Sequence, residues 1–205
     1  MRAVQSAVFT LGLALTGMTY GQGIAPSTEA HIDRLFERAT ADTPGCVVGV
    51  AQAGKPAWIK AYGMADLEHG VPNTASTIFE AGSVSKQFTA AAIALLAQDG
   101  KLGLDDAVRK YIPELPDYGA PLTIRHMLNH TSGLRDWGEV ARIGGLPRGS
   151  RVYTNADVLD IASRQSVLNF TPGTHWSYSN TGYNLAAIIV ERISGKSFST
   201  FTRER

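Results

Sequence analysis

Cysteine is almost absent from this sequence of 205 residues, where Cys46 stands alone, so an internal disulfide is excluded. Charge is also scarce: charged residues make up 18% of the chain, the net charge is +1, and the Lys and Arg residues are scattered. A nucleic-acid-binding protein would show a basic patch or stripe, so nucleic acid is not an expected partner. The sequence also lacks internal repeats and low-complexity linkers.

Long apolar runs are missing too. The N-terminal stretch "MRAVQSAVFTLGLALTGMTYGQG" has Arg2, an apolar run centred on Val8 to Leu15, and then small residues. The run is too short for a comfortable membrane span, but this layout is typical of a signal peptide. We therefore expect residues 1–21 to be cleaved after Gly21, no membrane span in the mature chain, and export to a bacterial periplasm or beyond.

The remaining composition is that of a globular protein, with 44% hydrophobic residues. Two apolar runs, Cys46–Ala53 and Ala57–Met64, flank Gly54-Lys55-Pro56 and predict a β-hairpin. Ile78–Ala81 is a candidate short strand. A lone hairpin is marginally stable and leaves its strand edges exposed. We therefore expect the sheet to be incomplete in this sequence, with further strands missing. With helices dominating the rest, the predicted class is α/β (α+β).

Helical spacing and capping residues predict the other elements. Helices are expected to start near Ser27, Val84, Thr123, Asn155, Thr181 and Ser197. In the second of these, Val84, Phe88, Ala91 and Leu95 form one stripe. The stretch 135–151 is rich in glycine and irregular, so it is a candidate lid or pocket rim.

The helix near Val84 opens with a possible nucleophile. Ser83 and Lys86 are three residues apart, so they share one helix face. A serine at a helix N-terminus lies beside free N–H groups, which favour a developing oxyanion. This is the only Ser-x-x-Lys in the chain. The alternative is a purely structural role, with Ser83 as a helix N-cap and Lys86 as a solvated surface residue.

A serine nucleophile needs a base, and no Gly-x-Ser-x-Gly elbow is present to suggest a catalytic triad. Two Tyr-x-Asn triplets are candidates, Tyr153-Thr154-Asn155 and Tyr178-Ser179-Asn180. In the first, Asn155 already has a role as a helix cap. The second lies in an aromatic loop, so Tyr178 and Asn180 are the preferred pair.

Three blocks resemble the serine β-lactamases and penicillin-recognising peptidases, in their class C-type branch. They are "FEAGSVSKQFTA", "LTIRHMLNHTSGL" and "PGTHWSYSNTGYNLAAIIVERISGKSF", in the order that the family has them. Ser-x-x-Lys is a signature of that superfamily. The resemblance covers most of Gly45 to Arg205, and the Tyr-Ser-Asn triplet points to class C enzymes and their esterase and D-aminopeptidase relatives.

The resemblance implies a β-lactamase/transpeptidase-like fold, in which an antiparallel sheet is flanked by helices beside an all-helical region. It implies that Ser83 is acylated, Lys86 takes part in proton transfer, Tyr178 is the base and Asn180 binds substrate or Lys86. It implies no metal and no organic cofactor. The expected partner is a small-molecule or peptide acyl substrate: a β-lactam, a D-amino-acid peptide or an ester.

One motif of the family is missing. A Lys- or His-Thr-Gly motif is expected downstream of Tyr178, and none is there; His130-Thr131-Ser132-Gly133 looks similar but precedes Tyr178. Our hypothesis is that residues 22–205 are the N-terminal portion of a larger hydrolase domain. The alternative is a penicillin sensor or inactive remnant of the same fold. His126 and His130 have the i, i+4 spacing of zinc ligands but lack the intervening Glu, so a structural pair is expected.

Overall fold

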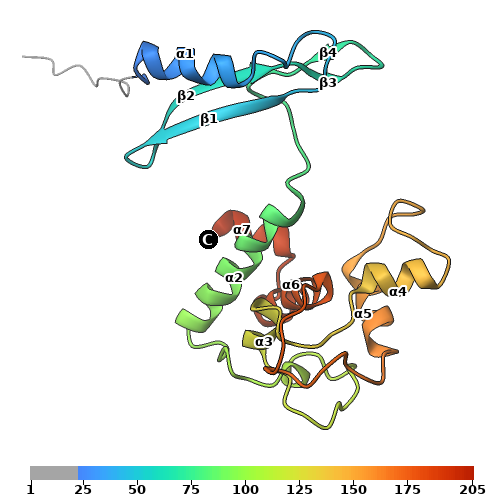
Figure 1. The fold of residues 1–205 in the computed structure, drawn as a ribbon. Coiled ribbons are helices and arrows are strands. Elements are labelled where there is room, and N and C mark those ends of the chain that lie inside the picture. The colour runs from blue at the N-terminus through green and yellow to red at the C-terminus, as the bar shows by residue number, and fades with distance from the viewer. Residues whose placement is uncertain (1–22) are drawn as a thin grey trace, which may run out of the picture. The chain divides into compact units, whose positions relative to one another are not determined.

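The computed structural model describes residues 23–205, and the predicted signal peptide lies outside them. The chain divides into two compact units, one ending at Glu80 and the other spanning Ala81–Arg205. Figure 1 shows the strands in the first unit and most of the helices in the second. Within residues 23–205, no helix is long and apolar enough to cross a membrane.

In its described part, residues 23–80, the first unit contains one helix and two small antiparallel sheets. Its elements are α1 (Pro26–Leu35), β1 (Cys46–Gln52), β2 (Lys55–Tyr62), β3 (Met64–Asp66) and β4 (Val71–Pro72), with β1 paired to β2 and β3 to β4. The hairpin prediction is confirmed. Ala53 and Gly54 between the strands both have positive φ, 49° and 74°, as the tight hairpin turns that match strand twist require.

Helix α1 is tied to β2 by the carboxylates of Glu29 and Asp33, both of which pair with Lys60. Asp33 accepts hydrogen bonds from Lys60 Nζ at 3.0 Å and from the Tyr62 hydroxyl at 2.7 Å. Phe36, just after the helix, stacks on the Tyr62 ring with centroids 5.0 Å apart. The burial of the phenol, followed by the Asp33 hydrogen bond, raises the pKa of Tyr62 to about 12. The helix therefore packs on the hairpin through polar and aromatic contacts together.

The predicted strand at Ile78–Ala81 is wrong. These residues have no regular structure and lead from the first unit to the second. A strand needs a neighbouring strand for its backbone hydrogen bonds, and Ile78 is instead 97% exposed.

The second unit is helical and is organised around α6 (Asn180–Ser194). The surrounding elements are η1 (Gly82–Ser85), α2 (Lys86–Gln98), η2 (Val108–Lys110), α3 (Ile124–Leu128), α4 (Trp137–Ile143), α5 (Asn155–Ser163) and α7 (Phe198–Glu204). Helix α6 packs against α2, α3, α4, α5 and α7. Leu185 and Ile189 are fully buried in its core. The helix ends at Gly195, whose φ of 67° is the left-handed cap conformation.

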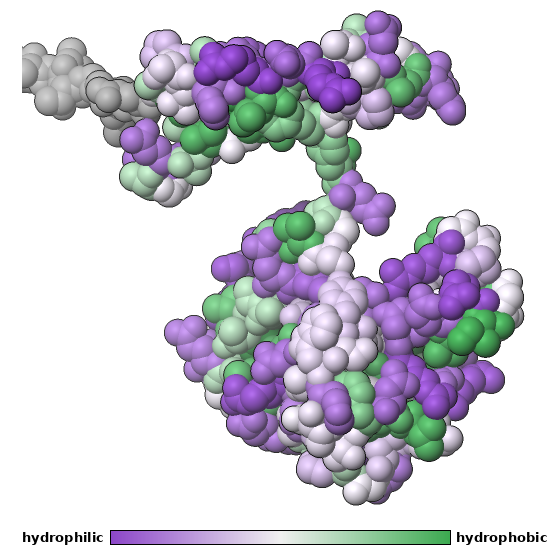
Figure 2. Space-filling view, in the orientation of Figure 1, coloured by the Kyte–Doolittle hydropathy of each residue, from purple (hydrophilic) through white to green (hydrophobic). Residues whose placement is uncertain are grey.

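The apolar stripe predicted for α2 lies on the wrong face. Val84 and Phe88 are 62% and 58% exposed, whereas Ala92, Ile93 and Leu96 are buried. This helix is rich in alanine and leucine nearly all round, so spacing alone does not select the face that meets α6. Figure 2 shows apolar surface on both units.

The stretch 135–151, predicted to be irregular, contains α4. Its N-cap is Asp136, whose side chain accepts hydrogen bonds from the backbone N–H groups of Gly138 and Glu139. A capping carboxylate satisfies N–H groups that a helix leaves free. The rest of the stretch, beyond Ile143, is irregular as predicted.

The cap of α5 is also displaced by one residue from the prediction. Thr154, rather than Asn155, accepts the hydrogen bond from Asp157 N, and Asp157 bonds back to Thr154 N in a capping box. The Asn155 side chain instead accepts a hydrogen bond from Asn184 Nδ2 at 3.0 Å. The caps predicted at Thr123 and Ser197 are confirmed.

Candidate active site

Ser83 and Lys86 stand at the junction of η1 and α2. Ser83 is the second residue of η1 and Lys86 the first residue of α2, so their side chains are one turn apart. Lys86 Nζ donates a hydrogen bond to Ser83 Oγ at 3.0 Å. Gly82, immediately before the serine, has a φ of 52°, a conformation that glycine adopts without steric cost.

Tyr178 reaches the same serine from far along the sequence. Its hydroxyl lies 2.6 Å from Ser83 Oγ, across a separation of 95 residues. Tyr178 stands two residues before α6, in the loop that follows Pro172-Gly173. The α2–α6 packing therefore brings the start of one helix to the start of the other, and the two oxygens are at proton-transfer distance.

Asn180 completes the cluster around the Lys86 ammonium. Its Oδ1 accepts a hydrogen bond from Lys86 Nζ at 2.8 Å. The same Nζ lies 4.9 Å from the centroid of the Tyr178 ring and 5.6 Å from that of Tyr183. All four residues singled out from the sequence, Ser83 included, thus meet within the second unit.

The electrostatics favour an ionisable Tyr178. Its hydrogen bond to Lys86, and then its hydrogen bond to Ser83, lower the pKa of Tyr178 below that of an ordinary tyrosine. Partial burial and the negative charge of Asp136 oppose this lowering of the pKa. The phenol is 42% exposed, so it is open to a substrate and to water.

His130 packs against this tyrosine, which the sequence did not indicate. The His130 ring centroid lies 4.5 Å from that of Tyr178 and 5.3 Å from that of Tyr183. Its Nδ1 accepts a hydrogen bond from Ser179 N at 3.3 Å, and its φ is 59°. Burial, and then the Lys86 charge, lower the pKa of His130. A neutral imidazole thus helps to hold the tyrosine loop.

Asp136, which lies in the stretch predicted to form a lid or pocket rim, also contacts the cluster. Its Oδ2 accepts hydrogen bonds from both the backbone N and the side-chain Nδ2 of Asn180, each at 2.7 Å. Asp136 follows the turn at Ser132-Gly133 by a few residues but is 44 positions from Asn180. No spacing rule connects residues so distant.

The other Tyr-x-Asn triplet lies elsewhere. The Tyr153 hydroxyl donates to the Leu146 carbonyl at 2.5 Å, and its ring packs against Trp137 with centroids 4.8 Å apart. Neither Tyr153 nor Asn155 hydrogen-bonds Ser83 or Lys86. The aromatic loop before α6, rather than the start of α5, therefore supplies the tyrosine of the cluster.

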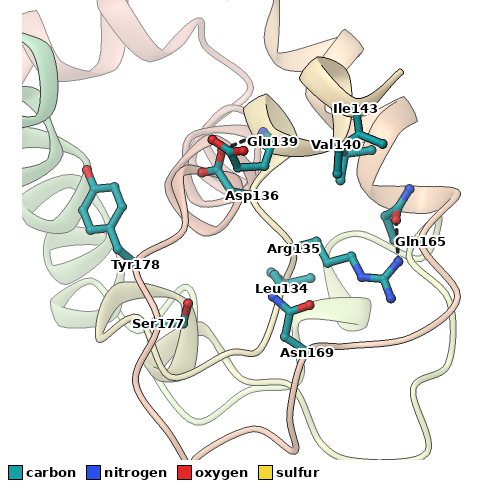
Figure 3. Close-up of a pocket in the computed structure, with 10 residues that line it drawn as sticks. All are labelled: Leu134, Arg135, Asp136, Glu139, Val140, Ile143, Gln165, Asn169, Ser177 and Tyr178. Atoms are coloured by element: carbon teal, nitrogen blue, oxygen red, sulfur yellow. Dashed lines mark hydrogen bonds between the residues drawn. The ribbon is translucent and has the colours of Figure 1, made fainter. Parts of the chain in front are cut away.

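A cavity of about 470 Å³ opens beside Tyr178. Figure 3 shows Tyr178 on one side and Val140 and Ile143 of α4 across from it. The lining consists of Leu134, Arg135, Asp136, Glu139, Val140, Ile143, Gln165, Asn169, Ser177 and Tyr178. Arg135 is held at the far wall by a hydrogen bond from its Nη1 to Gln165 Oε1 at 3.0 Å.

The predicted structural role of the histidine pair agrees with its contacts. His126 Nδ1 accepts a hydrogen bond from Thr123 N in the cap of α3, while His130 packs on the tyrosines. Among residues 23–205, no three His, Cys, Asp or Glu side chains come together as metal ligands would.

Comparison with known proteins gives a family match over residues 32–205, to the family described as Beta-lactamase. Penicillin-binding protein 4* of Bacillus subtilis (strain 168) is 36% identical over 84% of this chain and 38% of its own length. Esterase EstB of Burkholderia gladioli is 33% identical over 84% of this chain and 47% of its own.

A solved structure shares the fold. The D-amino acid amidase of Ochrobactrum anthropi SV3, in complex with L-phenylalanine, superposes with a TM-score of 0.69 at 29% identity. The match covers 86% of this chain and 46% of the amidase. This chain thus spans less than half the length of each of these proteins. The predicted α/β (α+β) class and β-lactamase/transpeptidase-like fold are confirmed by this superposition and by the mixture of helices and small antiparallel sheets.

Proposed function

We propose that this chain, which belongs to the beta-lactamase family, carries the nucleophile and the base of a serine hydrolase. The hydrolase works through an acyl–enzyme ester. The observation that carries the proposal is the contact of Ser83 Oγ with Tyr178 OH at 2.6 Å and with Lys86 Nζ at 3.0 Å. A hydroxyl held between a phenol of lowered pKa and an ammonium is in the arrangement of an activated nucleophile.

The first half of the reaction forms the ester. Tyr178, as the phenolate, takes the proton of Ser83 while Oγ attacks the substrate carbonyl carbon. The carbonyl oxygen gains negative charge in the tetrahedral intermediate. When the intermediate collapses, the bond from carbon to the leaving group breaks, and the Tyr178 proton passes to the leaving amine or alcohol.

The second half reverses the roles with water. Tyr178 takes a proton from a water molecule, and the hydroxide attacks the ester carbon. The carbon–Oγ bond then breaks, and the proton returns to Ser83. Lys86 remains the positive charge that favours the phenolate in both halves, and Asn180 holds that charge in place through its 2.8 Å hydrogen bond.

The oxyanion also needs donors. Ser83 lies within the first turn of η1, where backbone N–H groups lack an intrahelical acceptor. Its own N–H is therefore available to the developing charge, which such donors stabilise more in the transition state than in the ground state.

The substrate class follows from the relatives and from the cavity. The similar proteins are named as a penicillin-binding protein, an esterase and a D-amino acid amidase, so we propose a β-lactam, an ester or a D-amino-acid amide or peptide. Leu134, Val140 and Ile143 in the wall beside Tyr178 suit an apolar substituent next to the reacting carbonyl.

The test is covalent labelling followed by intact mass. The protein, isolated from its native source, is treated separately with a fluorophosphonate, a fluorescent penicillin and a p-nitrophenyl ester. We expect one adduct per chain, located on Ser83 by peptide mapping, and its loss in Ser83→Ala. Ser85→Ala is the matched control, because the Ser85 hydroxyl donates to the Gly82 carbonyl and makes no hydrogen bond to any of the proposed site residues.

The outcomes separate the alternatives. The proposal would be contradicted if the label persisted in Ser83→Ala. It would also be contradicted if none of the three probes labelled the wild type. A penicillin adduct that forms once and is not hydrolysed would favour the sensor, whereas repeated release of p-nitrophenol would establish turnover.

We also propose that the protein is exported. The support is the charged, apolar and small-residue order of residues 1–21. Sequencing the N-terminus of the protein from its native host should begin at Gln22 in the periplasmic or extracellular fraction. A chain that retains Met1 in the cytoplasm would contradict this proposal.

A further inference from the structure

The carboxylate of Asp136 accepts two hydrogen bonds from Asn180. One oxygen, Oδ2, accepts from the Asn180 backbone N and from its Nδ2, both at 2.7 Å. The Asp136 side chain is only 16% exposed. Short, largely buried hydrogen bonds to a charged acceptor are stronger than those between neutral groups.

This contact decides which way the Asn180 amide faces. The two ends of an asparagine amide have nearly the same shape, so packing alone does not distinguish them. A carboxylate is an acceptor, which requires the NH₂ group to face Asp136. An ammonium is a donor, which requires Oδ1 to face Lys86. Both neighbours of Asn180 therefore specify the same orientation.

The Asp136 carboxylate is itself fixed through its other oxygen. Oδ1 accepts from Gly138 N at 2.9 Å and Glu139 N at 3.3 Å at the start of α4, and from Arg148 Nη2 at 3.2 Å. The single carboxylate thus joins the N-terminal ends of α4 and α6.

A neighbouring pair of hydrogen bonds braces the same junction. Thr181, the residue after Asn180, accepts a hydrogen bond from Trp137 N at 2.8 Å and donates one to the Arg135 carbonyl at 2.7 Å. Backbone groups on both sides of Asp136 are therefore held to α6, which restricts the movement of the carboxylate relative to Asn180.

We propose that Asp136 is a positioning residue, which fixes the Asn180 amide with its oxygen toward Lys86 and so keeps the ammonium beside Ser83. This inference rests on the proposed function. Asp136 acts through Asn180 and takes no part in bond making. Its loss frees the amide to rotate, and Lys86 then loses an acceptor whose position was set.

The first test measures the rate at which the fluorophosphonate labels Ser83 in the whole protein. Asp136→Ala should slow labelling by about 100-fold, the size of effect that a small misplacement near a reacting group produces. Asn180→Ala should slow it to a similar extent. Because the two residues act in one chain of contacts, the double variant should be no slower than Asn180→Ala alone.

The matched control is Asp157→Ala. Asp157 also bonds at a helix N-terminus, to Thr154, and also pairs with an arginine, Arg151, but it touches none of the site residues. It should lose helix-end stability as Asp136→Ala does while labelling at the wild-type rate.

A pH profile distinguishes positioning from general loss of structure. The titratable groups that lie against Tyr178 include Lys86 on α2, His130 after α3, Asp136 before α4 and Tyr183 on α6. The other charged side chains that line cavities together with Tyr178 are Arg135, Glu139, Arg142 and Arg148. Lys86 is the largest cause of the lowered Tyr178 pKa, and the negative charge of Asp136 opposes that lowering as the smallest of the effects. If Asp136 acts by positioning Lys86, the acid limb of the labelling rate should therefore move to higher pH in Asp136→Ala. Removal of the Asp136 charge alone would move the limb to lower pH, and that result would overturn the positioning role.

A readout that needs no activity completes the design. The Asn180 side-chain NH₂ resonances, assigned by their loss in Asn180→Ala, should shift in Asp136→Ala and stay unchanged in Asp157→Ala. Equal labelling rates for the two aspartate variants, additive effects in the double variant, or unmoved amide resonances would each overturn the positioning role. A wild type that does not label at all would refute the proposed function instead, and the amide resonances would then decide the inference alone.

Discussion

Replacing Lys86 by methionine should move the pH at which Ser83 becomes reactive. The ammonium lies 4.9 Å from the Tyr178 ring centroid, and its hydrogen bond is the largest cause of the lowered tyrosine pKa. Methionine keeps most of the length and apolar stem but removes the charge. The phenol should then hold its proton to a higher pH.

The size of the shift follows from Coulomb's law. Two unit charges about 5 Å apart interact by about 3 kcal/mol at an effective dielectric of 20 and about 1 kcal/mol at that of water. Tyr178 is 42% exposed, so screening places the value between these limits. At about 1.4 kcal/mol per pKa unit, the acid limb of the acylation-rate profile should shift to higher pH by about one to two units in Lys86→Met.

The assay is the second-order rate of Ser83 acylation by a neutral p-nitrophenyl ester between pH 5 and 10. In the wild type, this rate should rise with pH through the Tyr178 pKa, because the phenolate is the reactive form. Lys86→Met should show the same rise at higher pH, and Tyr178→Phe should show none.

Lys110→Met is the matched control. Lys110 also lies over a tyrosine ring, that of Tyr111, at 5.1 Å, but it is remote from Ser83 in its contacts. It should leave the profile unchanged. An unchanged acid limb in Lys86→Met, or a limb retained in Tyr178→Phe, would refute the assignment of Tyr178 as the base that Lys86 tunes.

Three further predictions concern stability and the cavity. Gly133→Ala should lower the unfolding free energy by about 1 to 3 kcal/mol from backbone strain alone, since Gly133 has φ of 72° and a Cβ there would lie 2.2 Å from the Phe170 carbonyl oxygen; urea denaturation measures it, and an unchanged midpoint would contradict the geometry. Asp106→Asn should lower the melting temperature at pH 7 but not at a pH below the folded-state pKa. The Tyr111 hydroxyl is the first of the groups that hold the pKa of Asp106 below its usual value, so its stabilisation is present above the unfolded-state pKa and is lost as pH falls through the folded one; an equal deficit at both pH values would contradict this. Val140→Trp should narrow the cavity and raise KM for bulky acyl esters while that for acetyl esters stays unchanged; equal effects on both would show that the cavity does not hold the acyl group.

The serine–lysine pair could be predicted because the signal is local. Three residues of spacing at a helix start fix the separation of Ser83 and Lys86 whatever the tertiary structure does. Tyr178 needed a choice between two triplets, and the reason given for the choice was partly wrong, because Thr154 rather than Asn155 caps α5.

Other features depend on tertiary contacts that no local pattern carries. The contact of Asp136 with Asn180 joins residues 44 positions apart, and it exists because α4 and α6 begin at the same place. The predicted stripe of Val84 and Phe88 is exposed. An alanine-rich helix has little amphipathic contrast, so the contact with α6 selects the side that is packed.

The 95-residue separation of Ser83 from Tyr178 has a consequence for protein synthesis. A serine without its phenol and fixed ammonium is an ordinary alcohol, so under the proposed function Ser83 stays inert at least until the 95 residues that lead to Tyr178 have been synthesised. Reactivity should arise only after Tyr178 and the α6 that follows it have left the ribosome and packed on α2, because the pair must close a long loop before it can meet. Covalent labelling of ribosome-bound chains of increasing length would therefore date the folding of the second unit.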